Sequence, residues 1–416
     1  MATSLLKLEA QAEEQAESPQ CLALKDALAA ARKVVKAQED PALSQDDKKQ
    51  ELQATYDRAW AQLHAGNRGA DVQPWREVLA IASLLRGQME TEKPGEALRL
   101  VDLGLILGGP ESGAAPALFS LAERLAAELA EDDDADGRDA KRARTEPTPG
   151  ALLAEHFAEL PHIRCPPEEV AAHRTLGLEH FLVKHLGPRS PLVWRGGCGH
   201  WPATRKWPQV EFWTSGSLGQ RWVPVEMDYW LEEGFQLMQL NAFAKLCKEA
   251  ERRPVPKAGL SGGGYLAQHA LFEQLPQLEA DILTPDLALC GQGSLLRQVF
   301  FGPRGTVTPV HSDPYENIFC QVVGAKYLRL FPPEEASRLA PREDGELMQN
   351  NSRIEPADLL EGEKNGVYTD GPFHKLTEAS FLDVVLHPGD LLYLPRGWWH
   401  YVKSLSTSIS VAFHFT

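Results

Sequence analysis

The first third of the chain repeats apolar residues with the period of an α-helix. Leu24, Leu28, Ala31 and Val35 fall at i, i+4, i+7 and i+11, which is one stripe of an amphipathic helix. Further stripes lie at Leu52, Tyr56, Trp60 and Leu63, at Trp75, Val78, Leu79 and Ala82, and within residues 96–108 and 116–130. We therefore predict a helical domain over residues 21–130, after a polar segment 1–20 that we expect to be disordered. No clean internal repeat emerges, and a stack of helical hairpins stays open.

The apolar pattern stops at residues 131–150, where acidic residues, Gly and Pro take over. Such a run buries too little apolar surface to fold, and so we predict a linker. It contains a basic cluster, Lys141 to Arg144. An exposed cluster of this kind can act as a nuclear-import signal, or it can simply balance the acidic run beside it. We expect residence in the nucleus, the cytoplasm or both.

Residues 151–416 have the texture of β-strands. Short apolar segments separated by Gly, Pro and Asp are PLVWRG, RWVPVEM, SLLRQVFFG, NIFCQVV, KYLRLFPP, FLDVVLHPGDLLYLP, WHYVKSL and SISVAFHF. Many short strands with turn residues between them predict a β-barrel or sandwich. Helical stretches at Glu179–Leu186 and Asn241–Ala250 should pack outside it, and HPGD, ending at Asp390, should form a tight turn. The fold class predicted is α+β.

Length, net charge and cysteine spacing limit the kinds of domain, site and binding partner that we expect. A length of 416 residues favours two domains, and a net charge of −16 argues against broad nucleic-acid binding while suiting a basic peptide. The six cysteines are scattered without a CxxC pair, which excludes a zinc-finger or disulfide-framework spacing. No apolar run approaches the length of a membrane span, and no secretory signal is expected.

Two histidines and an aspartate are the main candidates for chemistry. His311 and Asp313 are two residues apart at a predicted strand end, so their side chains should point the same way. His400 lies far downstream in another apolar strand, where an imidazole needs a partner. Two imidazoles and one carboxylate can occupy one face of an octahedral iron and leave the other face open. The alternative is one structural aspartate and two packed histidines.

A lysine in an apolar strand is the second candidate. By strand alternation Val322, Gly324 and Lys326 share one face, which would turn Lys326 into the barrel. A cation there needs an anion, and a dicarboxylate co-substrate would supply one. Thr308 and Tyr265 offer hydroxyl donors to the same carboxylate, and Asn317 could hold a carboxylate nearer the metal. The alternative is an edge-strand lysine that discourages aggregation.

Competing patterns are weaker. GLSGG at residues 259–263 matches the GxSxG nucleophile elbow around Ser261, but the residues before it are polar and interrupted by proline, which favours a loop over a hydrolase. The remaining histidines considered have no obvious partner at ligand spacing; they are His185, His200, His269, His374 and His387.

The motifs PLVWRG, VPVEM, GYLAQH, FFGPRGTVTPVHSDPYEN, GAKYLRLF and HPGDLLYLPRGWWHYV resemble the JmjC-domain oxygenases. The resemblance covers roughly residues 155–416 and implies a double-stranded β-helix (jelly-roll or cupin) catalytic domain at 151–416. It implies dependence on Fe(II), 2-oxoglutarate and O2. The implied iron ligands are His311, Asp313 and His400, and the implied 2-oxoglutarate contacts are Lys326, Thr308, Tyr265 and Asn317.

The same resemblance points to a subgroup of protein-arginine hydroxylases, in which Glu226, Gln268 and Phe300 would contact the substrate. Phe300 stands where that subgroup has Trp, Ser312 where it has Gln, and His414 and Phe415 replace its terminal aromatic pair. The implied reaction is hydroxylation of an arginine side-chain carbon. The alternatives are a histone N-methyl-lysine demethylase and a non-catalytic binding module. The expected partner is a protein with a basic side chain, such as a histone or another nuclear, chromatin-associated protein, without direct nucleic-acid or membrane binding.

Overall fold

The structure is a computed structural model. It describes residues 21–64, 72–90, 92–141, 152–154, 160–172, 174–227, 235–252, 264–291, 293–343, 346, 348–355 and 357–416. The predicted disordered segment 1–20, most of the basic cluster in the linker and Ser261 lie outside these residues. The chain divides into two compact units, which are described one at a time.

The first unit is helical. Its helices are α2 (Cys21–Glu39), α3 (Gln45–His64), α4 (Gln73–Met89), α5 (Pro94–Gly108) and α6 (Ala115–Lys141). Residues of all the predicted stripes form its core, with Leu28, Leu52 and Val78 buried, but Trp60 of the second stripe is exposed. Pro74 lies in the first turn of α4, where its missing N–H leaves no hydrogen bond unmade. Because α6 continues to Lys141, the first part of the segment predicted as a linker is helical.

Two short segments from later in the chain, Ser215–Val223 and Gln239–Asn241, also belong to this unit. Arg221 forms an ion pair with Asp102 of α5, with Nη2 2.5 Å from Oδ1, and both side chains are almost fully buried. The backbone N–H of Trp222 donates to the same carboxylate at 2.8 Å. The domain predicted over 151–416 is therefore interrupted by segments that pack with the helices.

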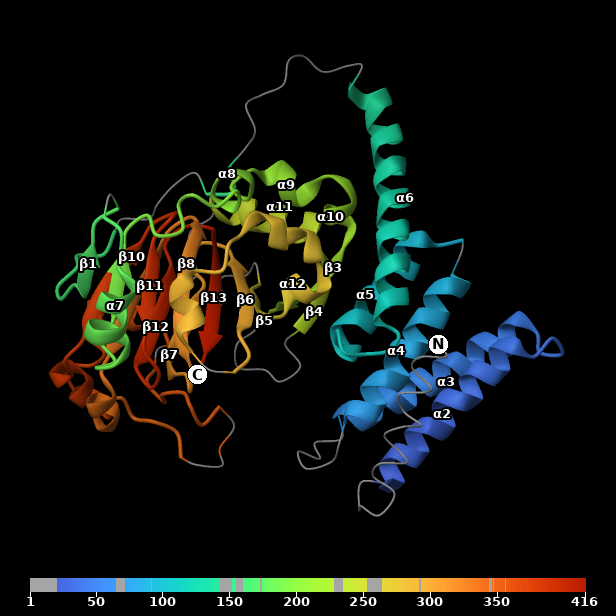
Figure 1. The fold of residues 1–416 in the computed structure, drawn as a ribbon, viewed down its shortest axis with the longest axis horizontal. Helices are drawn as coiled ribbons and strands as arrows, with labels where there is room; N and C mark the ends of the chain where they lie inside the picture. Colours follow the sequence, from blue (N-terminus) through green and yellow to red (C-terminus); the bar gives the residue numbers. More distant parts are fainter. Residues whose placement is uncertain are drawn as a thin grey trace. The chain divides into compact units, whose positions relative to one another are not determined.

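The second unit is built on two larger sheets and most of a two-stranded sheet. The seven-stranded sheet has the order β1 (Glu168–Val170), β2 (Leu192–Trp194), β11 (Leu391–Leu394), β8 (Glu316–Val323), β13 (Ser408–Phe415), β6 (Leu296–Gly302) and β5 (Leu266–His269). The four-stranded sheet has the order β10 (Leu382–Leu386), β9 (Lys326–Phe331), β12 (Trp399–Ser404) and β7 (Val307–Ser312). A separate pair is β3 (Trp222–Glu226) with β4 (Phe235–Gln239). Figure 1 shows β8, β13 and β6 side by side.

The two larger sheets share one apolar interior. Leu328 and Val402 from the four-stranded sheet pack in the same buried cluster as Phe319, Leu392 and Ala412 from the seven-stranded sheet. Two facing sheets with a common core are the jelly-roll arrangement, and so the predicted α+β fold with a cupin-type domain is confirmed. The turn at HPGD is also present, with the Asp390 N–H donating to the His387 carbonyl at 2.9 Å.

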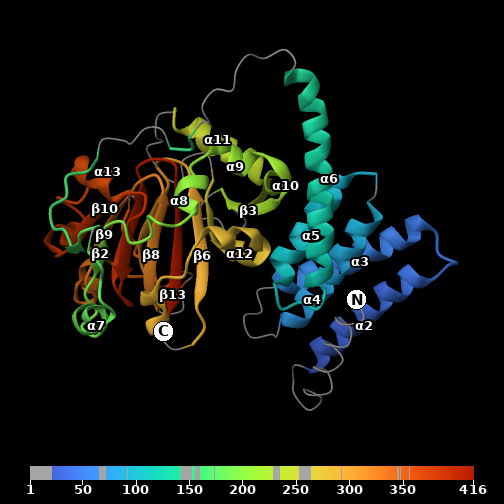
Figure 2. The same cartoon turned by 45° about the horizontal axis from the view of Figure 1, so that its top comes forward.

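Short helices cover the sheets of this unit (Figure 2). They are α7 (Leu178–Phe181), η1 (Leu182–Leu186), α8 (Ala203–Lys206), α9 (Val210–Thr214), α11 (Leu240–Ala250), α12 (Leu271–Gln274), η2 (Pro276–Asp281), η3 (Asp286–Cys290), η4 (Pro333–Arg338), α13 (Leu359–Lys364) and η5 (His374–Glu378); α10 (Gly216–Gln220) belongs to the first unit. Both predicted helical stretches are found. None of the helices described has the length and apolarity needed to cross a membrane.

Candidate active site

Strand register brings the two candidate histidines together. β12 runs antiparallel to β7, and His400 lies opposite His311 in that pairing. Asp313 follows the end of β7 directly, two residues after His311, so it projects to the same side. Each of the three residues offers one donor atom, and the three atoms lie within 4.8 Å of one another. The fold thus gathers two imidazoles and a carboxylate that the sequence keeps far apart.

Backbone carbonyls fix how the two imidazoles face this centre. Nδ1–H of His311 donates to the Pro309 carbonyl at 2.8 Å, and Nδ1–H of His400 donates to the Trp398 carbonyl at 3.1 Å. A carbonyl can only accept, so each ring carries its proton on Nδ1 and keeps a lone pair on Nε2. The Nε2 atoms lie 3.9 and 3.8 Å from Oδ2 of Asp313. This tautomer and this convergence suit a bound metal cation.

The electrostatics favour the ligating protonation states. Burial, reinforced by the neighbouring His311, lowers the pKa of His400 to about 3, so this ring is neutral at physiological pH. Burial by itself would raise the pKa of Asp313, but the adjacent imidazoles hold that pKa below its usual range. A neutral imidazole and an ionised carboxylate are the forms that coordinate metals.

Lys326 is buried deep in the same unit, with 1% of its surface exposed. Its Nζ lies 5.7, 5.7 and 5.4 Å from the ring centroids of Tyr265, Phe300 and Phe319. Burial lowers the pKa of Lys326 to about 7, and no carboxylate among the described residues offsets that effect. A buried cation surrounded by rings is costly unless an anion joins it.

The burial of Lys326 was predicted from alternation along one strand, and that reason is wrong. β8 ends at Val323, Gly324 turns the chain at φ 68°, and Lys326 begins β9 in the other sheet. A Cβ at Gly324 would lie 2.0 Å from the Thr407 carbonyl oxygen, so the turn requires glycine. Lys326 faces the interior because of this change of sheet, and not because a single strand alternates.

A small cavity of about 50 Å³ joins the lysine to the metal-ligand candidates. Its lining includes His311, Asp313 and His400 together with the four predicted co-substrate contacts, Lys326, Thr308, Tyr265 and Asn317. The Tyr265 hydroxyl lies 3.5 Å from Nζ of Lys326. Oδ1 of Asn317 is buried without a hydrogen-bond partner in the described part of the chain. A buried ammonium that no carboxylate offsets is a feature that a bound dicarboxylate would satisfy, and the Asn317 amide can donate to a carboxylate through Nδ2–H, so the residues fit 2-oxoglutarate.

The predicted substrate contacts line an adjoining cavity of about 180 Å³, which also reaches His311 and Asp313. Glu226, at the end of β3, exchanges both backbone hydrogen bonds with Tyr265 at 2.8 Å. Burial raises the pKa of Glu226 to about 7. Gln268 has φ 52°, a left-handed conformation that is uncommon for a side-chain-bearing residue and often marks functional sites. Phe300 lines both cavities.

One residue in both cavities carries no predicted role. His414 on β13 lies opposite Asn317 of β8, and its Nδ1 is buried without a hydrogen-bond partner in the described residues. Burial lowers its pKa, so the ring is neutral. Strand alternation in the sequence could have identified His414. It shares one face of the strand with Ser408 and Ser410, whereas the other face is entirely apolar.

Comparison with known proteins agrees with the fold described above for both units. A family described as a cupin-like domain matches residues 178–416, and a family described as KDM8-like, N-terminal ARM repeats matches residues 31–129. The lysine-specific demethylase JMJ30 of Arabidopsis thaliana is 33% identical over 380 residues, covering 87% of this chain and 84% of the relative. Lysine-specific demethylase 8 of Danio rerio is 32% identical over 375 residues, covering 87% and 86%. The chain belongs to the JmjC-domain proteins with a cupin-like fold.

The chain is therefore a 2-oxoglutarate-dependent oxygenase, and the interpretation as a non-catalytic module is not supported. Proteins of this family depend in general on Fe(II) and 2-oxoglutarate. The resemblance to lysine-specific demethylase 8 extends to the Xenopus tropicalis protein, which is 36% identical over 261 residues, covering 61% of this JmjC chain and 52% of that relative. The helical unit matches a family of ARM repeats, although no clean repeat emerged from the sequence. Such repeats have apolar positions in common more than identical residues.

Proposed function

We propose that this JmjC oxygenase oxidises a basic side chain of a protein substrate, with Fe(II) held by His311, Asp313 and His400. The observation that carries the proposal is the buried ammonium of Lys326 in one cavity with the three metal-ligand candidates. When bound, Fe(II) and 2-oxoglutarate supply the oxidising chemistry, in which O2 provides the oxygen inserted into a C–H bond while succinate and CO2 are released. The protein supplies binding, orientation and exclusion of water.

Lys326 would pair with the far carboxylate of 2-oxoglutarate, with Thr308 and Tyr265 donating hydrogen bonds and Asn317 nearer the metal. This ion pair would be strong because the pocket is apolar and few water molecules screen the two charges. The aromatic rings of Tyr265, Phe300 and Phe319 exclude water around the ammonium. These contacts would hold one end of the co-substrate in the cavity that the three metal-ligand candidates also line.

Glu226 would receive the cationic end of the substrate. Its burial makes an unpaired negative charge unfavourable, so the carboxylate gains most when a cation enters the adjoining cavity. Gln268 and Phe300 line the same cavity and would orient the side chain. The acidic net charge of −16 supports a basic protein partner, and histone tails are the first substrates to test.

N-methyl-lysine is the first candidate for the oxidised group, because the relatives carry the name lysine-specific demethylase. Insertion of oxygen into an N-methyl C–H bond gives a hemiaminal that loses formaldehyde, which is demethylation. Hydroxylation of an arginine carbon is the second candidate. It is favoured by the Glu226 carboxylate, because a guanidinium can pair with it through two parallel hydrogen bonds.

The test is to incubate the full-length protein with Fe(II), 2-oxoglutarate and air, and to offer matched peptides that contain either N-methyl-lysine or arginine. Loss of a methyl mass supports demethylation, and gain of one oxygen on the arginine peptide supports hydroxylation. Succinate formation without change in any basic peptide would reject the substrate class. Absence of succinate under all conditions, in protein that binds iron, would reject the proposed site.

A further inference from the structure

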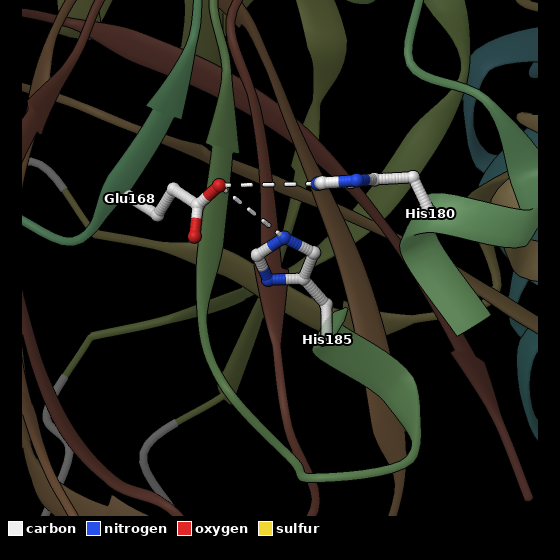
Figure 3. A group of neighbouring side chains, drawn as sticks. All are labelled: Glu168, His180 and His185. Atoms are coloured by element: carbon white, nitrogen blue, oxygen red, sulfur yellow. Dashed lines mark ion pairs between the residues drawn. The ribbon is translucent and has the colours of Figure 1, made fainter. Parts of the chain in front are cut away.

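A second cluster of metal-binding side chains lies at the edge of the seven-stranded sheet and shares no residue with the proposed active site. It consists of Glu168 on β1, His180 on α7 and His185 on η1. Oε1 of Glu168 lies 3.9 Å from Nε2 of His180 and 3.9 Å from Nε2 of His185. Figure 3 shows the carboxylate facing both imidazoles. All three donor atoms lie within 4.8 Å of one another.

A π-helical turn brings the two histidines together. Residues five apart on an α-helix are separated by about 140° around its axis and do not face each other. Here the Gly187 N–H donates to the Leu182 carbonyl at 2.9 Å, an i→i+5 bond that widens the turn. The ring centroids of His180 and His185 are 5.5 Å apart as a result. The prediction that His185 has no obvious partner at ligand spacing is therefore wrong, because the π-helical turn brings His180 beside it.

His185 supplies an independent sign of a ligand. Its side chain is fully buried, and its Nδ1–H donates to the Ser190 carbonyl at 3.2 Å, which leaves the lone pair on Nε2. That Nε2 is buried without a hydrogen-bond partner in the described residues, and it faces the cluster. Leaving a buried acceptor unsatisfied is unfavourable.

The other two donors are open to solvent, since the Glu168 side chain is 58% exposed and that of His180 is 48% exposed. Glu169, the next residue, points to the opposite face of β1, where Arg195 binds it at 2.5 Å. No arginine or lysine of the described residues pairs with Glu168 in the same way. The Glu168 carboxylate is thus available to a cation that arrives from solution.

We propose that Glu168, His180 and His185 form a divalent transition-metal site suited to Zn²⁺, separate from the iron centre. Two imidazoles and one carboxylate are a recognised zinc ligand set, and the fourth position would take water. Donors around tetrahedral zinc lie about 3.3 Å apart, so the distance from Glu168 to each imidazole needs to close by roughly half an ångström. The metal would pin β1, a strand of three residues at the sheet edge, to the turn formed by α7 and η1.

The test uses full-length, untagged protein in which His311→Ala and His400→Ala remove zinc binding at the iron centre. After treatment with a chelator, the protein is dialysed against Zn²⁺, and bound metal is measured by elemental analysis. We expect one zinc per chain. Adding Glu168→Ala or His180→Ala should weaken zinc binding at least about tenfold. Both substitutions are at exposed positions, so folding is retained and is checked by circular dichroism.

His374→Ala, a change at another exposed histidine, is the matched control and should leave the bound zinc unchanged. Zinc should also raise the melting temperature of the background variant, and this rise should vanish with His180→Ala. The proposal is overturned if the background variant binds no zinc, or if zinc binding survives both Glu168→Ala and His180→Ala at unchanged affinity.

Discussion

His400 lies opposite His311 where β12 pairs with β7, and the centroids of their rings are 4.0 Å apart. Each ring is held by a hydrogen bond to the backbone carbonyl two residues earlier in the chain. The backbone ladder therefore sets the spacing of the two Nε2 donors before any metal arrives. Preorganisation of this kind reduces what a ligand must reorder on binding.

Removal of one ring should abolish turnover. We expect His400→Ala to lower succinate formation by more than about 100-fold, because changing a residue that only supports a metal ligand already costs about 10–100-fold. His374→Ala should retain wild-type activity, and circular dichroism should show both variants folded. Substantial turnover by a folded His400→Ala enzyme would exclude this residue as a ligand.

The buried lysine should act on the co-substrate rather than on the metal. Lys326→Met keeps an apolar side chain of similar length, and we expect it to raise the Kd for 2-oxoglutarate at least about 100-fold, since losing one partner of a buried charge pair costs about 3–5 kcal/mol. Iron affinity should stay within a few-fold. Titration calorimetry under anaerobic conditions measures both values, and unchanged 2-oxoglutarate affinity would exclude the ion pair.

Binding of 2-oxoglutarate should take up a proton at alkaline pH. The pKa of Lys326 falls from 10.5 to about 7 in the empty site, so above pH 7 the folded protein has lost a proton that the unfolded chain keeps. Stability of the empty protein should accordingly rise with pH between about 7 and 10.5. The co-substrate pairs with the ammonium form of Lys326, and so its binding should return the proton to this side chain. Calorimetry at pH 8 in buffers of different ionisation enthalpy should show uptake approaching one proton, and Lys326→Met should abolish it.

Glu226 should govern the substrate and not the co-substrate. Glu226→Gln preserves shape but removes the charge, and we expect it to raise KM for the basic peptide roughly 10–100-fold, the value of a hydrogen bond between charged groups. Peptide-independent succinate formation should persist. Because the pKa of Glu226 in the empty site is about 7, KM of the wild type should rise as pH falls below 7, whereas KM of Glu226→Gln should not follow this trend. Equal KM values for the two enzymes at pH 8 would reject the contact.

Asp102 and Arg221 should stabilise the helical unit as a pair. Asp102→Asn and Arg221→Met each leave an opposite charge buried, and each should lower the free energy of unfolding by about 3–5 kcal/mol. The double variant should be less destabilised than the sum, because neither charge then lacks its partner. Arg99→Ala removes a half-exposed pair with Glu96 and should cost less than about 1 kcal/mol. Urea denaturation followed by circular dichroism checks these values.

The sequence by itself determined most of the segments that become helices and strands; the start of the predicted linker, which is helical up to Lys141, is an exception. Periodicity depends only on neighbouring residues. We could therefore predict the helix through Leu28 and Val35, and the apolar strand at His400, without knowing the tertiary structure. The predicted site residues could be chosen because an imidazole, a carboxylate or an ammonium inside apolar runs is costly without a purpose. The motifs around them supplied the family.

Only the tertiary structure decided how those segments meet. Strand pairing placed His400 opposite His311, and a turn at Gly324 moved Lys326 into the second sheet. A widened helical turn paired His180 with His185, and packing drew Arg221 to Asp102 in the helical unit. Register and sheet order are set by contacts between residues distant in the chain, and no window of neighbouring residues contains them.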